Sequence, residues 1–277
     1  LCGSVNLDML ACAAPNGRSV VRFVSEGYPE LEVSLDHLAP KKEEENTSAA
    51  LVRGVAAQIA GRGYPLSGVD VYAVSNVLSG SGLSSSAAYE VLLGNILNHF
   101  WCGGALDPIE IAKIGQFAEN VYFGKPCGLM DQMGSSVGGA VAIDFADPAG
   151  PVVERVDYDF TRSGHVLCIV DTGSSHGDLT DDYAAITREM GAVAAYFGKT
   201  VLREVPREQF RAALPALRRE CGDRAVLRAM HFYDEDRRAA EEAAALGEGD
   251  FAGRFLKLAN ASGQSSSLLL QNTWSVA

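Results

Sequence analysis

The sequence has few basic residues for its size. Its 277 residues include 23 lysines and arginines against 35 aspartates and glutamates, a formal net charge of −12. Nucleic acids and anionic membranes both attract proteins through a basic surface, so neither is expected as a general partner. No apolar run approaches the roughly 20 residues that a membrane-spanning helix needs, and no stretch has the pattern of a signal peptide. These absences argue against nucleic-acid-binding and membrane-spanning classes of protein.

Cysteine is sparse and unpatterned as well. The six cysteines are scattered, without a CxxC pair or a dense framework. This spacing predicts neither a disulfide scaffold nor a structural zinc site, and reduced thiols in a cytoplasmic protein are the expectation. His165 and His176 have no third ligand at a useful spacing, so we expect each to be a structural histidine.

Three common active-site motifs are missing too. No glycine-rich stretch continues into the Gly-Lys-Ser/Thr of a Walker A loop, and no strand leads into GxGxxG with a downstream ribose-binding acid. Ser174, Ser175 and His176 beside Asp171 imitate a hydrolase triad in composition, but no GxSxG elbow surrounds them. The sequence therefore favours neither a P-loop or Rossmann protein nor a triad hydrolase.

A glycine- and serine-rich turn is present instead. Residues 80–88 read GSGLSSSAA, between a strand predicted at 68–74 and an apolar helix predicted from 88 to 100. Glycines let a backbone approach a ligand closely, and the free N–H groups of a first helical turn attract anions. Ser84, Ser85 and Ser86 add hydroxyl donors and a candidate magnesium ligand. The loop therefore indicates phosphate binding, with an ordinary serine-capped helix start as the alternative.

A second cluster, residues 119–132, carries two carboxylates near glycines in a largely uncharged setting. A phosphate loop combined with carboxylates suggests magnesium-dependent phosphoryl transfer, where positioning and charge neutralisation supply most of the catalysis. From the residues alone, Glu119 could instead lie on a solvated helix face. Asp131 could likewise be a helix-capping residue.

Together, GSGLSSSAA and the run CGLMDQ at 127–132 resemble the galactokinase branch of the GHMP small-molecule kinases, whose stretches read GxGLSSSA and CGIMDQ. The resemblance implies a two-domain α+β kinase that uses ATP and Mg²⁺ to phosphorylate galactose at its anomeric hydroxyl, and we expect a monomer. A kinase for N-acetylgalactosamine or another galactose-like sugar is one alternative. A non-catalytic galactose- and ATP-binding regulator is the alternative from another class.

The resemblance also implies roles for individual residues. Asp131 would accept or orient the proton of the attacking sugar hydroxyl. Ser86 and Glu119 would hold magnesium, and Gly128, Asp131 and Tyr183 would contact the sugar. For Tyr183, a core anchor at a helix start is the alternative. The phosphate-binding loop would consist of Gly80, Ser81, Gly82, Leu83, Ser84, Ser85 and Ser86.

Local patterns predict the remaining elements, grouped as a β-rich first domain at 1–160 and a helix-rich second domain at 161–277. A turn at 147–151 is where the change of domain is expected to begin. We predict strands at 4–13, 20–24, 31–35, 137–145 and 152–160, and a buried strand at 165–171. We predict helices at 48–60, from an Asp107 cap to about Val121, and at 183–196, 207–220, 226–246 and 251–267.

Galactokinases carry two further motifs that do not occur in these residues. One is an arginine followed by a His-Thr-Asp run, before the strand that corresponds to 4–13; the other is a glycine-rich GGGFGG-like motif near the far end. We therefore interpret the chain as a fragment, and expect weak or absent activity from these residues alone because charge-neutralising and sugar-binding groups are lacking.

Overall fold

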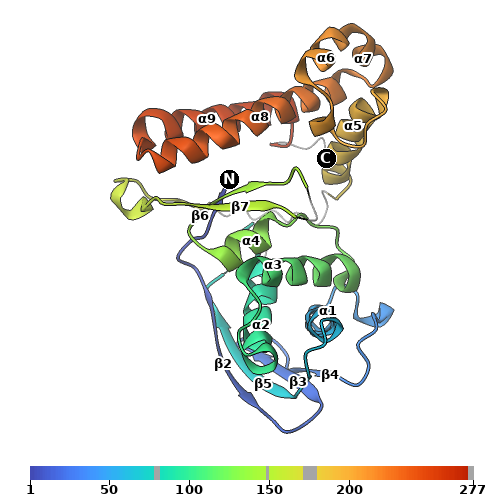
Figure 1. Cartoon of the computed structure of the whole chain (residues 1–277), viewed down its shortest axis with the longest axis vertical. Helices are drawn as coiled ribbons and strands as arrows, with labels where there is room; N and C mark the ends of the chain where they lie inside the picture. Colours follow the sequence, from blue (N-terminus) through green and yellow to red (C-terminus); the bar gives the residue numbers. More distant parts are fainter. Residues whose placement is uncertain (78–81, 148–149, 171–179, 274–277) are drawn as a thin grey trace. The chain divides into compact units, whose positions relative to one another are not determined.

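The computed structural model describes residues 1–77, 82–147, 150–170 and 180–273 (Figure 1). The chain divides into two compact units, Cys2–Val141 and Ala142–Ala277, the latter joined by Leu1. This division lies before the boundary expected between 160 and 161. The reason is that β7 (Val152–Val156) already packs against α8 (Asp223–Gly247) within the second unit.

A four-stranded sheet is the base of the first unit. Its order is β2 (Met9–Pro15), β5 (Val69–Ser75), β3 (Val20–Ser25) and β4 (Leu31–Ser34). β3 and β5 run parallel, and the other pairs are antiparallel. The strand predicted at 4–13 begins later, at Met9, because the residues before it pair with another sheet. There β1 (Cys2–Gly3) pairs with β6 (Ala140–Asp144), and the order of this second sheet is β1-β6-β7.

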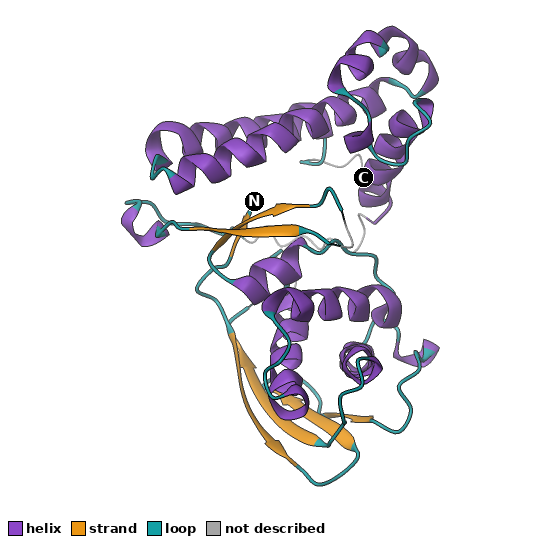
Figure 2. Ribbon diagram, viewed as in Figure 1, coloured by secondary structure: helices purple, strands orange, loops and turns teal. Residues whose placement is uncertain are grey.

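Helices α1 (Ser48–Gly61) and α2 (Ser85–Cys102) cover one face of the four-stranded sheet, and α3 (Pro108–Phe117) packs on these two helices (Figures 1 and 2). Strand residues alternate across the sheet, as a half-buried strand requires. The inward set packs against the helices and includes Val21, Phe23, Val33, Val69, Val71 and Ala73, all at most 3% exposed. The predicted cap of α3 is confirmed: Asp107 and Glu110 form a reciprocal capping box.

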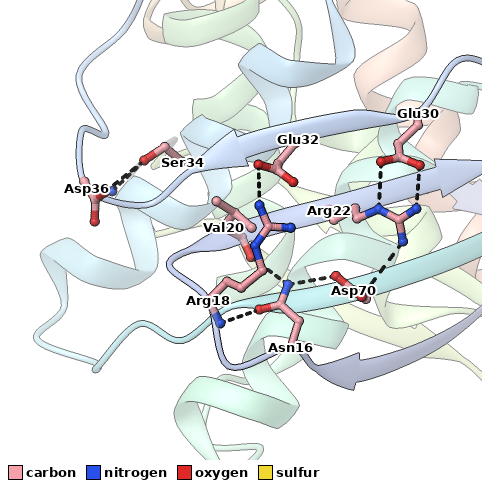
Figure 3. Close-up of polar contacts among 9 residues, drawn as sticks. All are labelled: Asn16, Arg18, Val20, Arg22, Glu30, Glu32, Ser34, Asp36 and Asp70. Atoms are coloured by element: carbon pink, nitrogen blue, oxygen red, sulfur yellow. Dashed lines mark hydrogen bonds and ion pairs between the residues drawn. The ribbon is translucent and has the colours of Figure 1, made fainter.

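The opposite face of the sheet carries a group of polar contacts (Figure 3). Arg22 of β3 donates to both carboxylate oxygens of Glu30, at 2.7 and 2.5 Å, and Arg18 donates to Glu32 at 2.8 Å. Asn16 donates to Asp70 of β5 at 2.8 Å. These partners are solvent-exposed or nearly so, so the pairs keep the face soluble while adding little to stability.

A buried arginine fastens α1 to the segment before it. The Arg53 side chain is 2% exposed and makes two 2.7 Å bonds to the carboxylate of Glu44, whose pKa the arginine lowers. Its Nη1 donates to the backbone carbonyls of Ser34 and His37. Four of the five N–H groups of the guanidinium therefore have a protein acceptor.

We expect Arg53→Leu to lower the free energy of unfolding by about 3 kcal/mol, because it removes the buried partner of two carbonyls and leaves the Glu44 carboxylate with only Lys41, 3.5 Å away. Urea unfolding followed by Trp101 fluorescence in a Trp274→Phe background measures this. Arg22→Leu, an exposed arginine of the same unit, is the matched control and should cost far less. Equal losses in the two variants would contradict the assignment.

The second unit is helical. Its α-helices are α5 (Thr180–Tyr196), α6 (Arg207–Ala212), α7 (Leu214–Glu220), α8 and α9 (Leu256–Ser265). π-Helices flank α9 at Phe251–Phe255 and Ser266–Leu270, and short 3₁₀ turns occur at Phe160–Arg162 and Leu202–Glu204. The single helix predicted at 207–220 is wrong, because Pro215 lacks an N–H and starts a new helix after Ala213. No helix among the described residues is long and apolar enough to cross a membrane.

The buried strand predicted at 165–171 is also wrong. Residues 165–170 are described and lack regular secondary structure. Val166, Leu167 and Val170 are 86%, 75% and 79% exposed. An apolar run has the composition of a buried strand, but it forms one only where another strand pairs with it. No strand of the described residues pairs with this run. Asp171 and residues 172–179, including the serines and histidine of the imitated triad, lie outside the described residues.

Candidate active site

The glycine- and serine-rich stretch leads into α2, which begins at Ser85 rather than at the predicted residue 88. Ser84 precedes α2 in the left-handed backbone conformation, with φ 56° and ψ 57°. Its hydroxyl makes no capping bond to the described first turn of α2 and donates instead to the Asp131 carboxylate. An ordinary serine cap at Ser84 is therefore ruled out, and a non-glycine residue at positive φ is the kind of strain that collects at functional sites. Gly80 and Ser81 lie outside the described residues.

Asp131 lies in the first turn of α4 (Met130–Val137), a helix that the sequence patterns did not reveal. Leu129 is the N-cap, so the helix-capping alternative for Asp131 is ruled out. The next residues of α4, Gln132 and Met133, are buried, whereas Asp131 is exposed. Asp131 lines a cavity of about 450 Å³ together with Gly82, Leu83 and Ser84 of the turn, with α2, and with residues Cys2–Met9.

Glu119 contacts the first turn of α2. Its carboxylate Oε1 accepts a 3.1 Å hydrogen bond from the Ser86 hydroxyl and lies 3.5 Å from Lys125 Nζ. Glu119 is only 3% exposed, so the solvated-face alternative is wrong. The cause is a π-helix, η2 (Ala118–Phe123), which continues α3 with a wider turn and rotates the residues after Phe117. The same rotation leaves the apolar side chain of Val121 47% exposed.

The Ser86 and Glu119 oxygens suit a divalent cation. A hard cation prefers oxygen donors, and Mg²⁺ is commonly held by one or two protein ligands together with phosphate oxygens and water. Within the described residues, no three His, Cys, Asp or Glu side chains gather as a self-sufficient metal site. A metal here would therefore need a phosphate to complete its shell, and Lys125 supplies the neighbouring positive charge.

Two residues that the sequence reasoning missed lie behind Glu119. Gln132 Nε2 donates to Glu90 Oε2 and to Glu119 Oε2, both at 3.0 Å. Glu90 and Gln132 are 0% and 1% exposed. A signal was available, because Glu90 is the only acidic residue of α2 and follows Ser86 by one helical turn.

Burial raises the pKa of Glu90 to about 8, and the nearby charge of Glu119 adds to this, while the Gln132 hydrogen bond opposes it. Among the described residues, Glu90 Oε1 has no hydrogen-bond partner. A charged carboxylate with one oxygen buried and unpaired would be costly. Glu90 is therefore protonated in the folded protein at neutral pH.

This raised pKa makes stability depend on pH. Above its ordinary value of 4.5, the unfolded chain releases the Glu90 proton while the folded protein keeps it up to about pH 8. The contribution of the Glu90 proton to the free energy of unfolding is therefore full below about pH 4.5 and is lost as the pH rises toward 8. We expect Glu90→Gln, which cannot ionise, to gain roughly 3 kcal/mol over the wild type between about pH 5 and pH 8. Parallel urea unfolding of both proteins measures it; a constant difference would contradict the protonated state.

Comparisons with known proteins match this geometry to a family. Residues 50–139, which include the turn, Glu119 and Asp131, match the model of the GHMP kinases N terminal domain. These residues are a GHMP kinase N-terminal domain. The whole chain has the GHMP kinase fold. It is similar to a crystal structure of Lactococcus lactis galactokinase complexed with galactose, with a TM-score of 0.73 and 24% sequence identity. The match covers 96% of this chain and 69% of that chain.

Two curated galactokinases are similar to this chain in sequence. That of Streptomyces coelicolor is 35% identical over 220 residues, or 79% of this chain and 56% of that protein. That of Clostridium tetani is 34% identical over 135 residues, covering 49% of this chain and 34% of that protein. The matched regions thus span about half or less of those relatives.

The predicted sugar contacts of this chain are not brought together within one unit. Gly128 is exposed just before α4, near Asp131 in the chain, and a side chain built on it would meet nothing within 4 Å. Tyr183 belongs to the second unit, near the start of α5, and its ring is 53% exposed rather than packed in a core. Its predicted contact with the sugar stays a prediction.

Proposed function

We propose that the protein containing this chain is an ATP-dependent kinase that phosphorylates galactose at the anomeric hydroxyl. The observation that carries the proposal is the contact between Ser84 and Asp131, since it joins the predicted phosphate loop to a carboxylate at one cavity. The family of residues 50–139 and the similarity to galactokinases support the reaction and the sugar.

In the proposed mechanism the loop at 80–86 and the start of α2 hold the ATP phosphates by backbone N–H groups and serine hydroxyls. Asp131 accepts a hydrogen bond from the anomeric hydroxyl and takes its proton as that oxygen attacks the γ-phosphorus. The new oxygen–phosphorus bond forms as the bond to the β–γ bridging oxygen breaks, and ADP leaves with that electron pair. Galactose 1-phosphate and ADP are the products.

Ser86 and Glu119 would hold the magnesium ion that accompanies ATP. Bound there, Mg²⁺ would neutralise charge on the β- and γ-phosphate oxygens. Gly128 and Tyr183 would contact the sugar. In this arrangement the two carboxylates have separate duties, because Glu119 is buried beside a hydroxyl and a lysine whereas Asp131 is exposed to the cavity.

Coupled ADP release by the full-length protein tests the proposal, with galactose, N-acetylgalactosamine, glucose and mevalonate as separate acceptors. We expect release that depends on galactose and on Mg²⁺. Release with N-acetylgalactosamine alone would transfer the activity to that sugar. If no acceptor releases ADP while calorimetry still detects galactose and ATP binding, the kinase proposal fails in favour of a sensor.

A further inference from the structure

The structure contains a buried polar bridge that the proposed mechanism does not use. It consists of Glu90 on α2, Gln132 on α4 and the inner oxygen of Glu119 on η2. One amide nitrogen, Gln132 Nε2, has two hydrogens, and each carboxylate lies 3.0 Å from it. All three side chains are at most 4% exposed, so water does not compete for these bonds.

The bridge leaves the outer oxygen of Glu119 available to the site. Gln132 binds Oε2, whereas Oε1 accepts from the Ser86 hydroxyl at 3.1 Å. A carboxylate held by one oxygen cannot rotate freely about its last torsion, so the other oxygen keeps its direction. Because Glu90 is protonated, it accepts the other hydrogen of the amide without placing a second negative charge beside Glu119.

Neighbouring residues are shaped to accommodate this bridge. Gly115 on α3 packs directly on it: a Cβ built there would lie 3.1 Å from Glu90 Oε2 and 3.4 Å from Gln132 Cγ. Ser86 and Glu90 are one turn apart on α2, and Asp131 and Gln132 are consecutive on α4. The bridge therefore fixes the relative position of the two helix starts that carry Ser86 and Asp131.

We propose that Gln132 and Glu90 are positioning residues that hold the Glu119 carboxylate toward Ser86 and thereby set the affinity of this site for a divalent cation. The inference rests on the proposed function, in which Ser86 and Glu119 hold the metal of the nucleotide. Hydrogen bonds behind a metal ligand orient it, and their loss commonly weakens metal affinity 10- to 100-fold.

The test is Mn²⁺ binding to the full chain in the presence of ADP, measured by electron paramagnetic resonance of free Mn²⁺. We expect Gln132→Leu and Glu90→Leu each to raise the Mn²⁺ dissociation constant about tenfold. Glu90→Gln keeps an uncharged acceptor of the same shape and should bind Mn²⁺ as the wild type does. Arg53→Leu removes another buried side chain of this unit, one whose hydrogen bonds reach Glu44, Ser34 and His37 and not the bridge, so it controls for loss of stability and should leave Mn²⁺ binding unchanged.

The outcomes separate two failures. If Glu119→Gln weakens Mn²⁺ binding but Gln132→Leu and Glu90→Leu do not, the positioning role is overturned while the proposed metal pair stands. If Glu119→Gln also leaves Mn²⁺ binding unchanged, both the metal-binding role of Ser86 and Glu119 and the positioning role are wrong. The proposed galactose kinase activity would still be tested separately by ADP release. Equal weakening by Arg53→Leu would likewise overturn the positioning role, because general destabilisation would then explain the loss.

Discussion

Asp131→Asn should lower kcat for galactose phosphorylation by about 10³-fold in the full-length protein, while the KM for galactose changes little. Asparagine keeps the shape of the side chain and can still accept a hydrogen bond from Ser84, but it cannot take a proton. Positioned proton transfer is worth 10²- to 10⁴-fold in rate, and this variant removes that contribution together with one negative charge. Steady-state ADP release at saturating ATP measures kcat and KM separately.

The matched control is Asp8→Asn. Asp8 lines the same cavity, and its carboxylate accepts from Asn76 rather than from the serine turn. The control removes the same charge, so it should leave kcat within a few-fold of the wild type. If Asp8→Asn were as damaging as Asp131→Asn, general cavity charge would be responsible. A kcat for Asp131→Asn close to the wild type would refute a role in proton transfer.

Glu119→Gln is expected to lower kcat/KM for MgATP by about 10²-fold, the scale of losing one electrostatic contact to the transferring group. It should also raise the Mg²⁺ concentration needed for half-maximal rate, because a neutral amide oxygen is a weaker ligand for a hard cation. Initial rates across a Mg²⁺ series at fixed ATP measure both effects, and high Mg²⁺ should restore part of the rate.

Glu110→Gln provides the comparison for this second variant. Glu110 is also an acid of the α3 region, but its side chain accepts from the Asp107 backbone in the capping box. Its substitution should leave the Mg²⁺ dependence unchanged. The assigned metal role would be wrong if Glu119→Gln reached full rate at the same Mg²⁺ concentration as the wild type.

The glycine- and serine-rich turn and both carboxylates could be located from the sequence. Their burial and their contacts could not. Gly82, Ser84 and Ser86 could be recognised because glycines and hydroxyls before a helix have a local meaning. The cap at Asp107 is local as well, and it was found. That Ser84 meets Asp131 and Ser86 meets Glu119 depends on tertiary packing of α2 against α3 and α4, which no spacing rule contains.

The errors have physical causes of the same kind. Helical periodicity predicted a flanking position for Glu119 because it assumes 3.6 residues per turn, whereas η2 is wider. The apolar run at 165–170 has the composition of a core strand, yet Val166 and Val170 are exposed because composition does not provide a pairing strand. Glu90 was not singled out at all in the sequence, because only its burial and its contact with Gln132 reveal its role.

The π-helix at Ala118–Phe123 also limits which changes of length this part of the chain can tolerate. Removing the exposed Val121 would let the segment relax to an α-helix and would turn everything beyond the deletion by about 100° relative to what precedes it. Glu119 would then lose its alignment with Ser86, or Tyr122 would lose its 2.7 Å bond to the Leu38 carbonyl. Substitution of Val121 should therefore have little effect on these contacts, whereas deletion of the residue should disrupt one of them.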